Sequence, residues 1–140
     1  MPIKRAISEI ITEAAKFEDD QERVDFLRKN DVAPLRVLLQ YALDSRVRWL
    51  LPEGEIPYKP NKEYPDLHGM LYSRARTLYL FVENSKAPAM TIEKRVTLWR
   101  QLLETVLPED AEFLERIRNG QVWKTINKKV VNRAFPGLVK

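Results

Sequence analysis

The sequence predicts an all-α fold, and three observations support that prediction. Apolar residues recur at the three- and four-residue spacing of amphipathic helices along most of the chain. Capping residues, prolines and glycines stand between these apolar segments, where helices are expected to begin and end. The length of 140 residues suits one domain with one hydrophobic core. We therefore expect a single compact domain over residues 1–140, with about seven helices and one long proline-rich loop.

Three helices are expected in the first third of the chain. The first has an apolar stripe formed by Ile3, Ile7, Ile10, Ile11 and Ala14. The second begins at Asp19 or Asp20, because either carboxylate can accept a hydrogen bond from the first helical turn. The third begins after Asp31, with Pro34 in its first turn, and it ends at Asp44.

A proline-rich loop is expected over residues 50–65. Its prolines are Pro52, Pro57, Pro60 and Pro65. Each proline lacks an amide hydrogen and restricts the residue before it, so this stretch cannot be a helix. Aromatic and apolar residues in and beside the stretch, including Trp49, Ile56 and Tyr58, are expected to anchor it to the surface. Long loops without secondary structure are uncommon in compact domains and are often functional.

The fourth and fifth helices follow this loop. The fourth is expected from Leu67 to about Glu83, with Asp66 as its N-terminal cap. Thr91 is expected to cap the fifth. The apolar stripe of the fifth helix consists of Val96, Trp99, Leu102, Leu103, Val106 and Leu107.

Two more helices complete the predicted fold. Pro108 begins the sixth, and Glu109 and Asp110 in its first turn interact favourably with the helix dipole. Gly120 ends that helix, because glycine readily adopts the left-handed conformation of a helix C-terminus. Thr125 is expected to cap the seventh helix.

The composition excludes several classes of enzyme. The chain has no cysteine and one histidine, which excludes disulfides, thiolate zinc sites, cysteine nucleophiles and multi-histidine metal sites. That histidine, His68, has no nearby residue that specifies a catalytic partner, so we expect it to be structural or exposed. The four glycines are too scattered to form a phosphate-binding loop. We expect no enzymatic activity, no metal ion and no cofactor.

One acidic cluster could in principle hold a divalent cation. It consists of Glu18, Asp19, Asp20 and Glu22. The cluster lacks the alternating ligand spacing and central glycine of a calcium-binding EF-hand loop. Its place at a helix start explains it better, because acidic side chains stabilise the first turn of a helix.

The charge of the chain is unevenly distributed. The net charge is +4, but residues 1–66 have 11 basic and 13 acidic residues, whereas residues 67–140 have 13 basic and 7 acidic residues. After Asn119 the chain has five basic residues and no acidic residue. This asymmetry indicates an anionic partner for the C-terminal half, most often a nucleic acid. An ordinary solvated basic face is the alternative.

Long cations on exposed helix faces are the candidate contacts to DNA phosphates. The primary candidates are Lys124, Lys128, Lys129 and Arg133. Within this set, residues 129 and 133 are separated by one helical turn, and like charges at that spacing are unfavourable unless an anion lies between them. The secondary candidates are Arg74, Arg76 and Arg116. Contacts of this kind bind the DNA backbone without reading base sequence.

The C-terminal 27 residues, Leu114 to Lys140, resemble the end of a known DNA-binding domain. The matching residues are Leu114, Arg116, Ile117, Asn132, Arg133, Phe135, Pro136, Gly137 and Leu138. They follow the pattern L-x-R-[IV], then a short turn and a helix that ends in N-[KR]-x-[FW]-P-G-L. This pattern is similar to that of the N-terminal domain of ATP-dependent DNA ligases from T-even-type phages. The residues Ile7, Glu9, Ile10 and 26–30 resemble the opening helices of the same domain.

The resemblance implies a helical domain that grips duplex DNA around a nick. It does not imply ligation, because the K-x-D-G motif of the ligase nucleotidyltransferase domain does not occur in the sequence. The turn before the last helix also differs: the ligases have R-D-L-x-x-G where this chain has residues 120–125, G-Q-V-W-K-T. Trp123 in this turn is either an exposed binding residue or part of the core.

The sequence therefore predicts a non-enzymatic phage accessory protein that binds duplex DNA, nicked or intact, through its backbone phosphates. It is expected in the cytoplasm of the infected bacterial host, because no apolar segment is long enough to span a membrane. The alternative is a protein-interaction or virion-associated module that has lost DNA binding, with a phage replication or virion protein as partner. Its interface would be an apolar surface around Trp49, Ile56, Tyr58 and Trp123.

Overall fold

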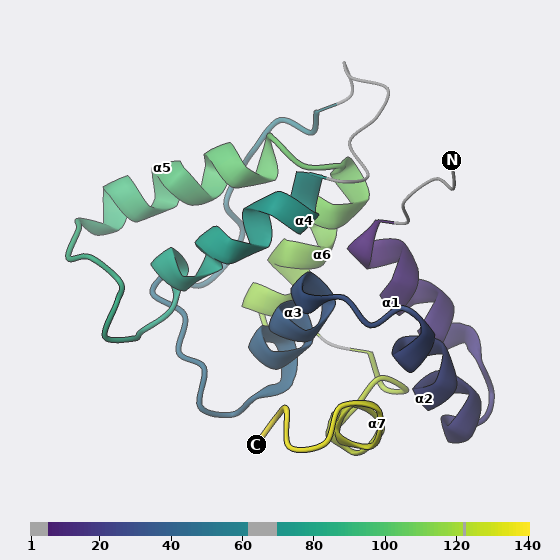
Figure 1. Ribbon diagram of the computed structural model, residues 1–140. Helices are drawn as coiled ribbons and strands as arrows, with labels where there is room; N and C mark the ends of the chain where they lie inside the picture. Colours follow the sequence, from purple (N-terminus) through teal and green to yellow (C-terminus); the bar gives the residue numbers. More distant parts are fainter. Residues whose placement is uncertain (1–5, 62–69, 122) are drawn as a thin grey trace.

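The computed structural model describes residues 6–61, 70–121 and 123–140, and these residues form an all-α domain (Figure 1). The elements are α1 (Ile7–Lys16), α2 (Asp20–Lys29), α3 (Ala33–Leu43), α4 (Met70–Arg74), the 3₁₀-helix η1 (Ala75–Phe81), α5 (Ile92–Leu103), α6 (Pro108–Arg118) and α7 (Lys128–Ala134). The described residues contain no strand, and one isolated antiparallel bridge joins Trp49 to Val82. The predicted all-α fold with seven α-helices is confirmed for this part of the chain.

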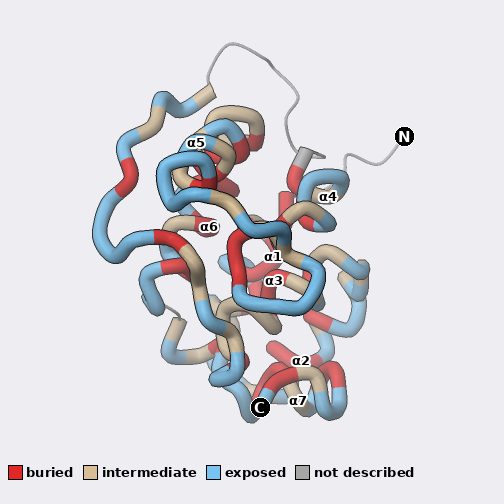
Figure 2. Tube along the Cα trace, turned by 90° about the vertical axis from the view of Figure 1, so that its left-hand side faces the viewer, coloured by how far each residue is buried: buried red, intermediate tan, exposed pale blue. Residues whose placement is uncertain are grey.

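Helix α6 lies at the centre of the domain, in contact with α1, α3 and α5 (Figure 1). Helix α2 packs against α1 on one side and against α7 on the other. Figure 2 marks the buried stretches of the chain along its Cα trace, with the loop of residues 44–61 along one side of the domain. The resulting core is rich in aromatic rings. Trp99 is fully buried and packs edge-on against two rings, with centroid distances of 4.9 Å to Phe81 and 5.7 Å to Trp49.

Several predicted boundaries are confirmed. The hydroxyl of Thr91 accepts a hydrogen bond from the amide of Lys94 at 3.1 Å and so caps α5. Pro108 lies in the first turn of α6, as proline at a helix start should. Gly120 follows α6 with φ +73°, a left-handed conformation that glycine adopts without the steric cost of a Cβ atom.

The fourth helix differs from the prediction. A continuous α-helix was expected over residues 67–83, but α4 ends at Arg74 and the chain continues as the 3₁₀-helix η1 to Phe81. The hydroxyl of Thr77 donates a hydrogen bond to the carbonyl of Arg74 at 2.7 Å, which satisfies that carbonyl within the tighter turn. The expected cap Asp66 and His68 lie outside the described residues.

The predicted cap of the seventh helix is wrong. Asn127, and not Thr125, caps α7, because its side chain accepts a hydrogen bond from the amide of Val130 at 3.0 Å. The hydroxyl of Thr125 instead donates to the carbonyl of Ala15 at 3.0 Å. This bond joins the segment before α7 to α1.

Two other helix boundaries are shifted. Val32 lies at the N-cap of α3, and Asp31, which was expected to precede the helix directly, forms a salt bridge with Arg36 at 2.9 Å. Helix α5 ends at Leu103 instead of Leu107. The amides of residues 105 and 106 both bond to the carbonyl of residue 102, which closes the helix in a turn.

The described part of the proline-rich loop, residues 50–61, is attached to the helices by hydrogen bonds. The guanidinium of Arg118 donates to the carbonyl of Pro52 at 2.7 Å, and that of Arg100 donates to the carbonyl of Pro57 at 3.0 Å. The amide of Lys59 donates to the carboxylate of Glu104 at 2.8 Å. The loop is therefore fixed in place without secondary structure, and it forms one wall of a cleft described below.

Candidate functional site

A basic edge lies along α7, on the side of the domain where α7 packs against α2. We define the basic edge as Lys124, Lys128, Lys129 and Arg133, and Arg28 of α2 lies beside it. The Arg28 guanidinium donates to the carbonyls of Arg133 at 2.6 Å and Ala134 at 3.4 Å. These bonds satisfy carbonyls at the end of α7, where a cation also interacts favourably with the helix dipole. Arg28 thereby fixes the position of α7 on α2.

The lysines of the basic edge are exposed and unpaired. Lys124, Lys128 and Lys129 form no salt bridge with any residue that the structure describes. Lys128 and Lys129 lie in the first turn of α7, where the helix dipole disfavours positive charge. Their charges therefore do not stabilise the fold and are available to an external anion.

Some other surface cations are paired with carboxylates. Arg46 lies 2.7 Å from Asp44, and hydrogen bonding from the Arg46 side chain holds the pKa of Asp44 well below its usual range. Arg133 is held differently, because its guanidinium donates to the neutral amide oxygen of Gln21 at 2.6 Å and so keeps an uncompensated charge. What distinguishes the basic edge is the clustering of its cations, because residues 124–133 have four basic residues and no acidic residue.

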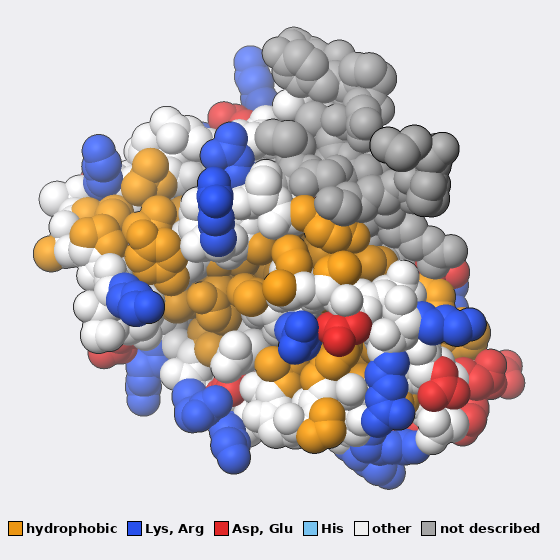
Figure 3. All heavy atoms as spheres, viewed as in Figure 1, with side chains coloured by type: hydrophobic (Ala, Val, Ile, Leu, Met, Phe, Trp, Pro, Cys, Tyr) orange, Lys and Arg blue, Asp and Glu red, His pale blue; other side chains and the backbone are white. Residues whose placement is uncertain are grey.

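The seven residues predicted to contact DNA lie in three parts of the structure: the basic edge, the α4–η1 segment and a cleft. Arg74 and Arg76 are exposed on α4 and η1, which Figures 1 and 2 place at the other end of the domain from α7, with α3 between them. Arg116 lies in a cleft beside Trp123. Figure 3 shows Lys and Arg side chains spread over the face that includes α4 and α7, whereas acidic side chains gather mainly at its right-hand edge near α2.

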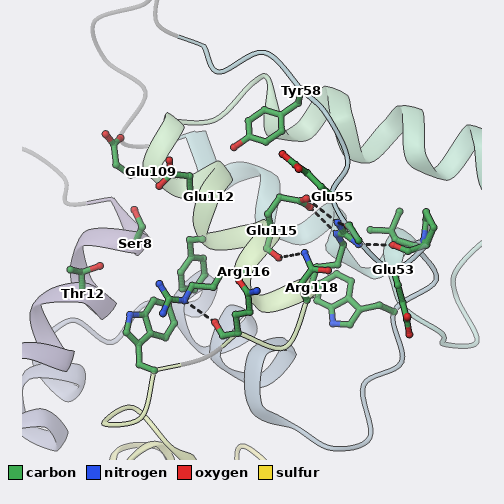
Figure 4. Close-up of a pocket in the computed structure, with 18 of the residues that line it drawn as sticks. Ser8, Thr12, Glu53, Glu55, Tyr58, Glu109, Glu112, Glu115, Arg116 and Arg118 are labelled. Carbon is green, nitrogen blue, oxygen red and sulfur yellow. Dashed lines mark hydrogen bonds and ion pairs between the residues drawn. The ribbon is translucent and has the colours of Figure 1, made fainter.

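The second candidate site is a cleft of about 1390 Å³ between α1, the loop of residues 49–58, α6 and the segment after α6. In Figure 4 α1 lies at the left and α5 at the right, the reverse of Figure 1, so the cleft opens on the side that faces away in Figures 1 and 3. Trp49, Tyr58 and Trp123 line it. We call it the acidic cleft, for the side chains described next.

Glutamates from three parts of the chain converge on the acidic cleft. Besides Glu115, they are Glu9, Glu13, Glu53, Glu55, Glu109 and Glu112. The cleft has only two basic side chains, Arg116 and Arg118, to balance these seven carboxylates. Burial raises the pKa of the Tyr58 hydroxyl, and the nearby carboxylates of Glu112, Glu115 and Glu55 raise it further. The cleft is therefore a region of negative potential.

Glu115 and Arg118 form the floor of the cleft (Figure 4). The Glu115 carboxylate accepts hydrogen bonds from the Trp99 indole at 2.7 Å and from the Arg118 Nε and Nη2 atoms at 2.8 and 2.9 Å. Burial opposes the charge of Glu115, but the hydrogen bonds from Arg118 and Trp99 together lower its pKa. Arg118 also donates to the carbonyls of Pro52 and Gly54, so it joins the loop to α6.

The aromatic residues predicted as a protein interface have different roles. Trp123 is half-buried, stacks on Phe113 at 5.3 Å and lies under the Arg116 guanidinium at 5.1 Å. Ile56, in contrast, is only 4% exposed and belongs to the hydrophobic core. It was expected on the surface, but its side chain packs in the core, so it cannot contact a partner.

Ser8 and Asp110 form a buried polar pair at the edge of the cleft, where α1 meets α6. The amide of Ser8 donates to the Asp110 carboxylate at 3.0 Å. The Ser8 hydroxyl and the second Asp110 oxygen are buried and make no hydrogen bond. Burial raises the pKa of Asp110, and the hydrogen bonding from Ser8 only partly opposes this.

Replacing Asp110 with asparagine is expected to stabilise the protein at pH 7 and to flatten its pH dependence. A carboxyl whose pKa is raised by folding stabilises the fold fully only below its unfolded pKa, and this contribution is lost as the pH rises through the folded pKa. Asparagine keeps an acceptor for the Ser8 amide without the buried charge. Urea unfolding between about pH 3 and pH 8 measures the difference, and an Asp110→Asn variant that is less stable at pH 7 would contradict this account.

No group of three Asp, Glu or His side chains in the described parts of the chain could hold a metal ion, although the cleft has many carboxylates. The acidic residues Asp20 and Glu22 lie in the first turn of α2, the position predicted for them. No helix in residues 6–61, 70–121 and 123–140 is long and apolar enough to cross a membrane.

The sequence did not indicate the acidic cleft. Its glutamates come from α1, the loop and α6, and no spacing within any one segment distinguishes them from solvated surface residues. The signal that was available was the recurrence of paired acids, at 53 and 55 and again at 109 and 112. Without the fold, nothing shows that these pairs meet.

Comparison with known families gives one match. The model of a family of unknown function, DUF6433, matches residues 10–124, and the chain belongs to this family. The matched range includes the loop, α6 and Trp123, and it ends before α7. A comparison with curated proteins finds no match.

Proposed function

We propose that this member of the DUF6433 family is a non-enzymatic phage accessory protein that binds duplex DNA, nicked or intact, through its backbone phosphates. The observation that supports this most is the basic edge, whose exposed lysines have no acidic partner among the described residues. The resemblance of residues 114–140 to a ligase DNA-binding domain supports the same function. That resemblance stays a prediction, as does a location in the cytoplasm of an infected host.

The proposed binding is electrostatic. Lysine and arginine side chains on the basic edge would replace the counterions condensed on the DNA, and the release of those ions drives association. Such contacts fix the position of the protein on the duplex but do not read base edges. Arg74 and Arg76 lie too far along the domain to share a short site with α7, so they would contribute only to a duplex that extends past α3.

The triple variant Lys124→Ala/Lys128→Ala/Lys129→Ala is expected to bind a labelled duplex at least about tenfold more weakly than the wild type at low salt. The matched control is Lys59→Ala/Lys86→Ala/Lys94→Ala, which removes the same charge from other exposed positions. Fluorescence anisotropy with nicked and intact duplexes measures both. Equal losses in the two variants would show that the affinity depends on net charge alone and would refute the basic edge as the site.

A second candidate function is protein interaction, with or without assembly into the virion. The acidic cleft favours it, because Trp49, Tyr58 and Trp123 line a concave surface on the side of the domain away from α4. Aromatic residues are enriched at protein interfaces. This function does not require the loss of DNA binding, because the basic edge and the cleft have no residue in common.

A further inference from the structure

We propose that the acidic cleft binds an extended, arginine-rich segment of a partner protein. This inference goes beyond DNA binding, since phosphates would be repelled from the cleft. It depends on three properties of the cleft: the spread of its carboxylates, the aromatic rings between them, and its size.

The carboxylates of the cleft are many but dispersed. The exposed glutamates Glu53 and Glu55 lie on the loop, whereas Glu109 and Glu112 lie on α6 (Figure 4). No three of the cleft's carboxylates could hold one metal ion. A ligand that matches this arrangement has several positive charges separated by several ångströms, as successive arginines of an extended peptide have.

The aromatic residues favour arginine over lysine. The cleft already holds one guanidinium against a ring, because Arg116 lies over Trp123 at 5.1 Å. Planar guanidinium groups stack on aromatic faces and bind carboxylates through two parallel hydrogen bonds, whereas an ammonium group does neither. Tyr58 and Trp49 offer partly exposed rings farther along the same cleft.

The dimensions of the cleft suit a polypeptide segment. Its volume of about 1390 Å³ exceeds the range of roughly 300–1,000 Å³ that is typical of small-molecule pockets. The cleft is bounded by α1 at one end and by the loop at the other, so a segment can lie along α6 between them (Figure 4). Charge complementarity and the rings then select a basic segment.

The test uses the full chain and a labelled peptide of about nine arginines. The variant Glu53→Gln/Glu55→Gln/Glu109→Gln/Glu112→Gln removes four exposed carboxylates from the cleft. The control Glu18→Gln/Glu22→Gln/Glu83→Gln/Glu93→Gln removes four exposed carboxylates elsewhere, so both variants have the same net charge. We expect the cleft variant to bind the peptide at least about tenfold more weakly than the wild type, and the control to lose less than threefold.

A nona-lysine peptide is expected to bind the wild type several-fold more weakly than the arginine peptide. Equal affinity for both peptides, equal losses in the two variants, or displacement of the peptide by millimolar spermidine would overturn the proposal. Self-association of the wild type that the cleft variant abolishes would also overturn it, because a second copy of the chain would then be the occupant. The failure of this proposal would leave DNA binding at the basic edge untouched.

Discussion

Replacing Arg118 with leucine is expected to lower the free energy of unfolding by about 3–5 kcal/mol. The Arg118 side chain is 2% exposed and the Glu115 side chain is 15% exposed, so the pair is largely removed from water. After the substitution, the Glu115 carboxylate would have two remaining donors, the Trp99 indole and the backbone amide of Ile56 at 3.5 Å. A buried carboxylate that loses its cation costs far more than an exposed one, because water cannot replace the lost interactions.

The carbonyls of Pro52 and Gly54 would lose their donors in the same substitution. The loop wall of the cleft should therefore exchange its amide hydrogens faster, in addition to the global loss of stability. Urea unfolding monitored by circular dichroism measures the first effect, and hydrogen exchange measures the second. The matched control is Arg116→Leu, two residues away on α6, where the exposed guanidinium contributes about 1 kcal/mol through its contact with Trp123. Similar stabilities for the two variants would contradict the assigned role of Arg118.

The affinity for duplex DNA is expected to fall roughly 100-fold between about 50 and 200 mM salt. Four cations of the basic edge, Lys124, Lys128, Lys129 and Arg133, have no carboxylate partner among the described residues. If each neutralises one phosphate, the logarithm of the association constant should fall with the logarithm of the salt concentration with a slope of about −3.6. The acidic cleft should not contribute to this slope, because its carboxylates do not approach the DNA.

Much of the helical architecture could be predicted from the sequence, because burial imposes a period. The stripe that includes Trp99, Leu102 and Leu103 became the buried face of α5. Phe113 and Leu114 are buried on α6. Where one face of a helix is buried, apolar residues must recur at the helical spacing, and so the pattern and the structure agree.

The predictions of helix type and helix caps fail where tertiary contacts override local propensity. Residues 75–81 have a helical pattern, yet η1 forms because a side-chain hydrogen bond from Thr77 and packing against α3 favour the tighter turn. Thr125 is a good capping residue, but its hydroxyl donates a hydrogen bond to the carbonyl of Ala15 on α1 instead. Helix α3 is distant from η1 in sequence, and Ala15 is 110 residues from Thr125, so neither of these contacts could be identified before the fold was known.

The candidate sites were only partly predictable for a related reason. The cations of the basic edge are close in sequence, and a local count of charge indicates them. The sequence could not distinguish the roles of Arg116 and Arg118, because they are two residues apart in the same predicted helix. In the structure Arg118 is buried under the loop and Arg116 is exposed. The acidic cleft depends on three segments that meet only in the folded chain.

The salt dependence of DNA binding, measured for the wild type and for Lys124→Ala/Lys128→Ala/Lys129→Ala, tests the central claim most directly. The account predicts a slope of about −3.6 for the wild type and a slope of about −0.9 for the variant, since only Arg133 would remain. Parallel slopes for the two proteins would contradict it, because the phosphates would then be neutralised by cations outside the basic edge. A wild type with no measurable affinity at low salt would contradict it as well.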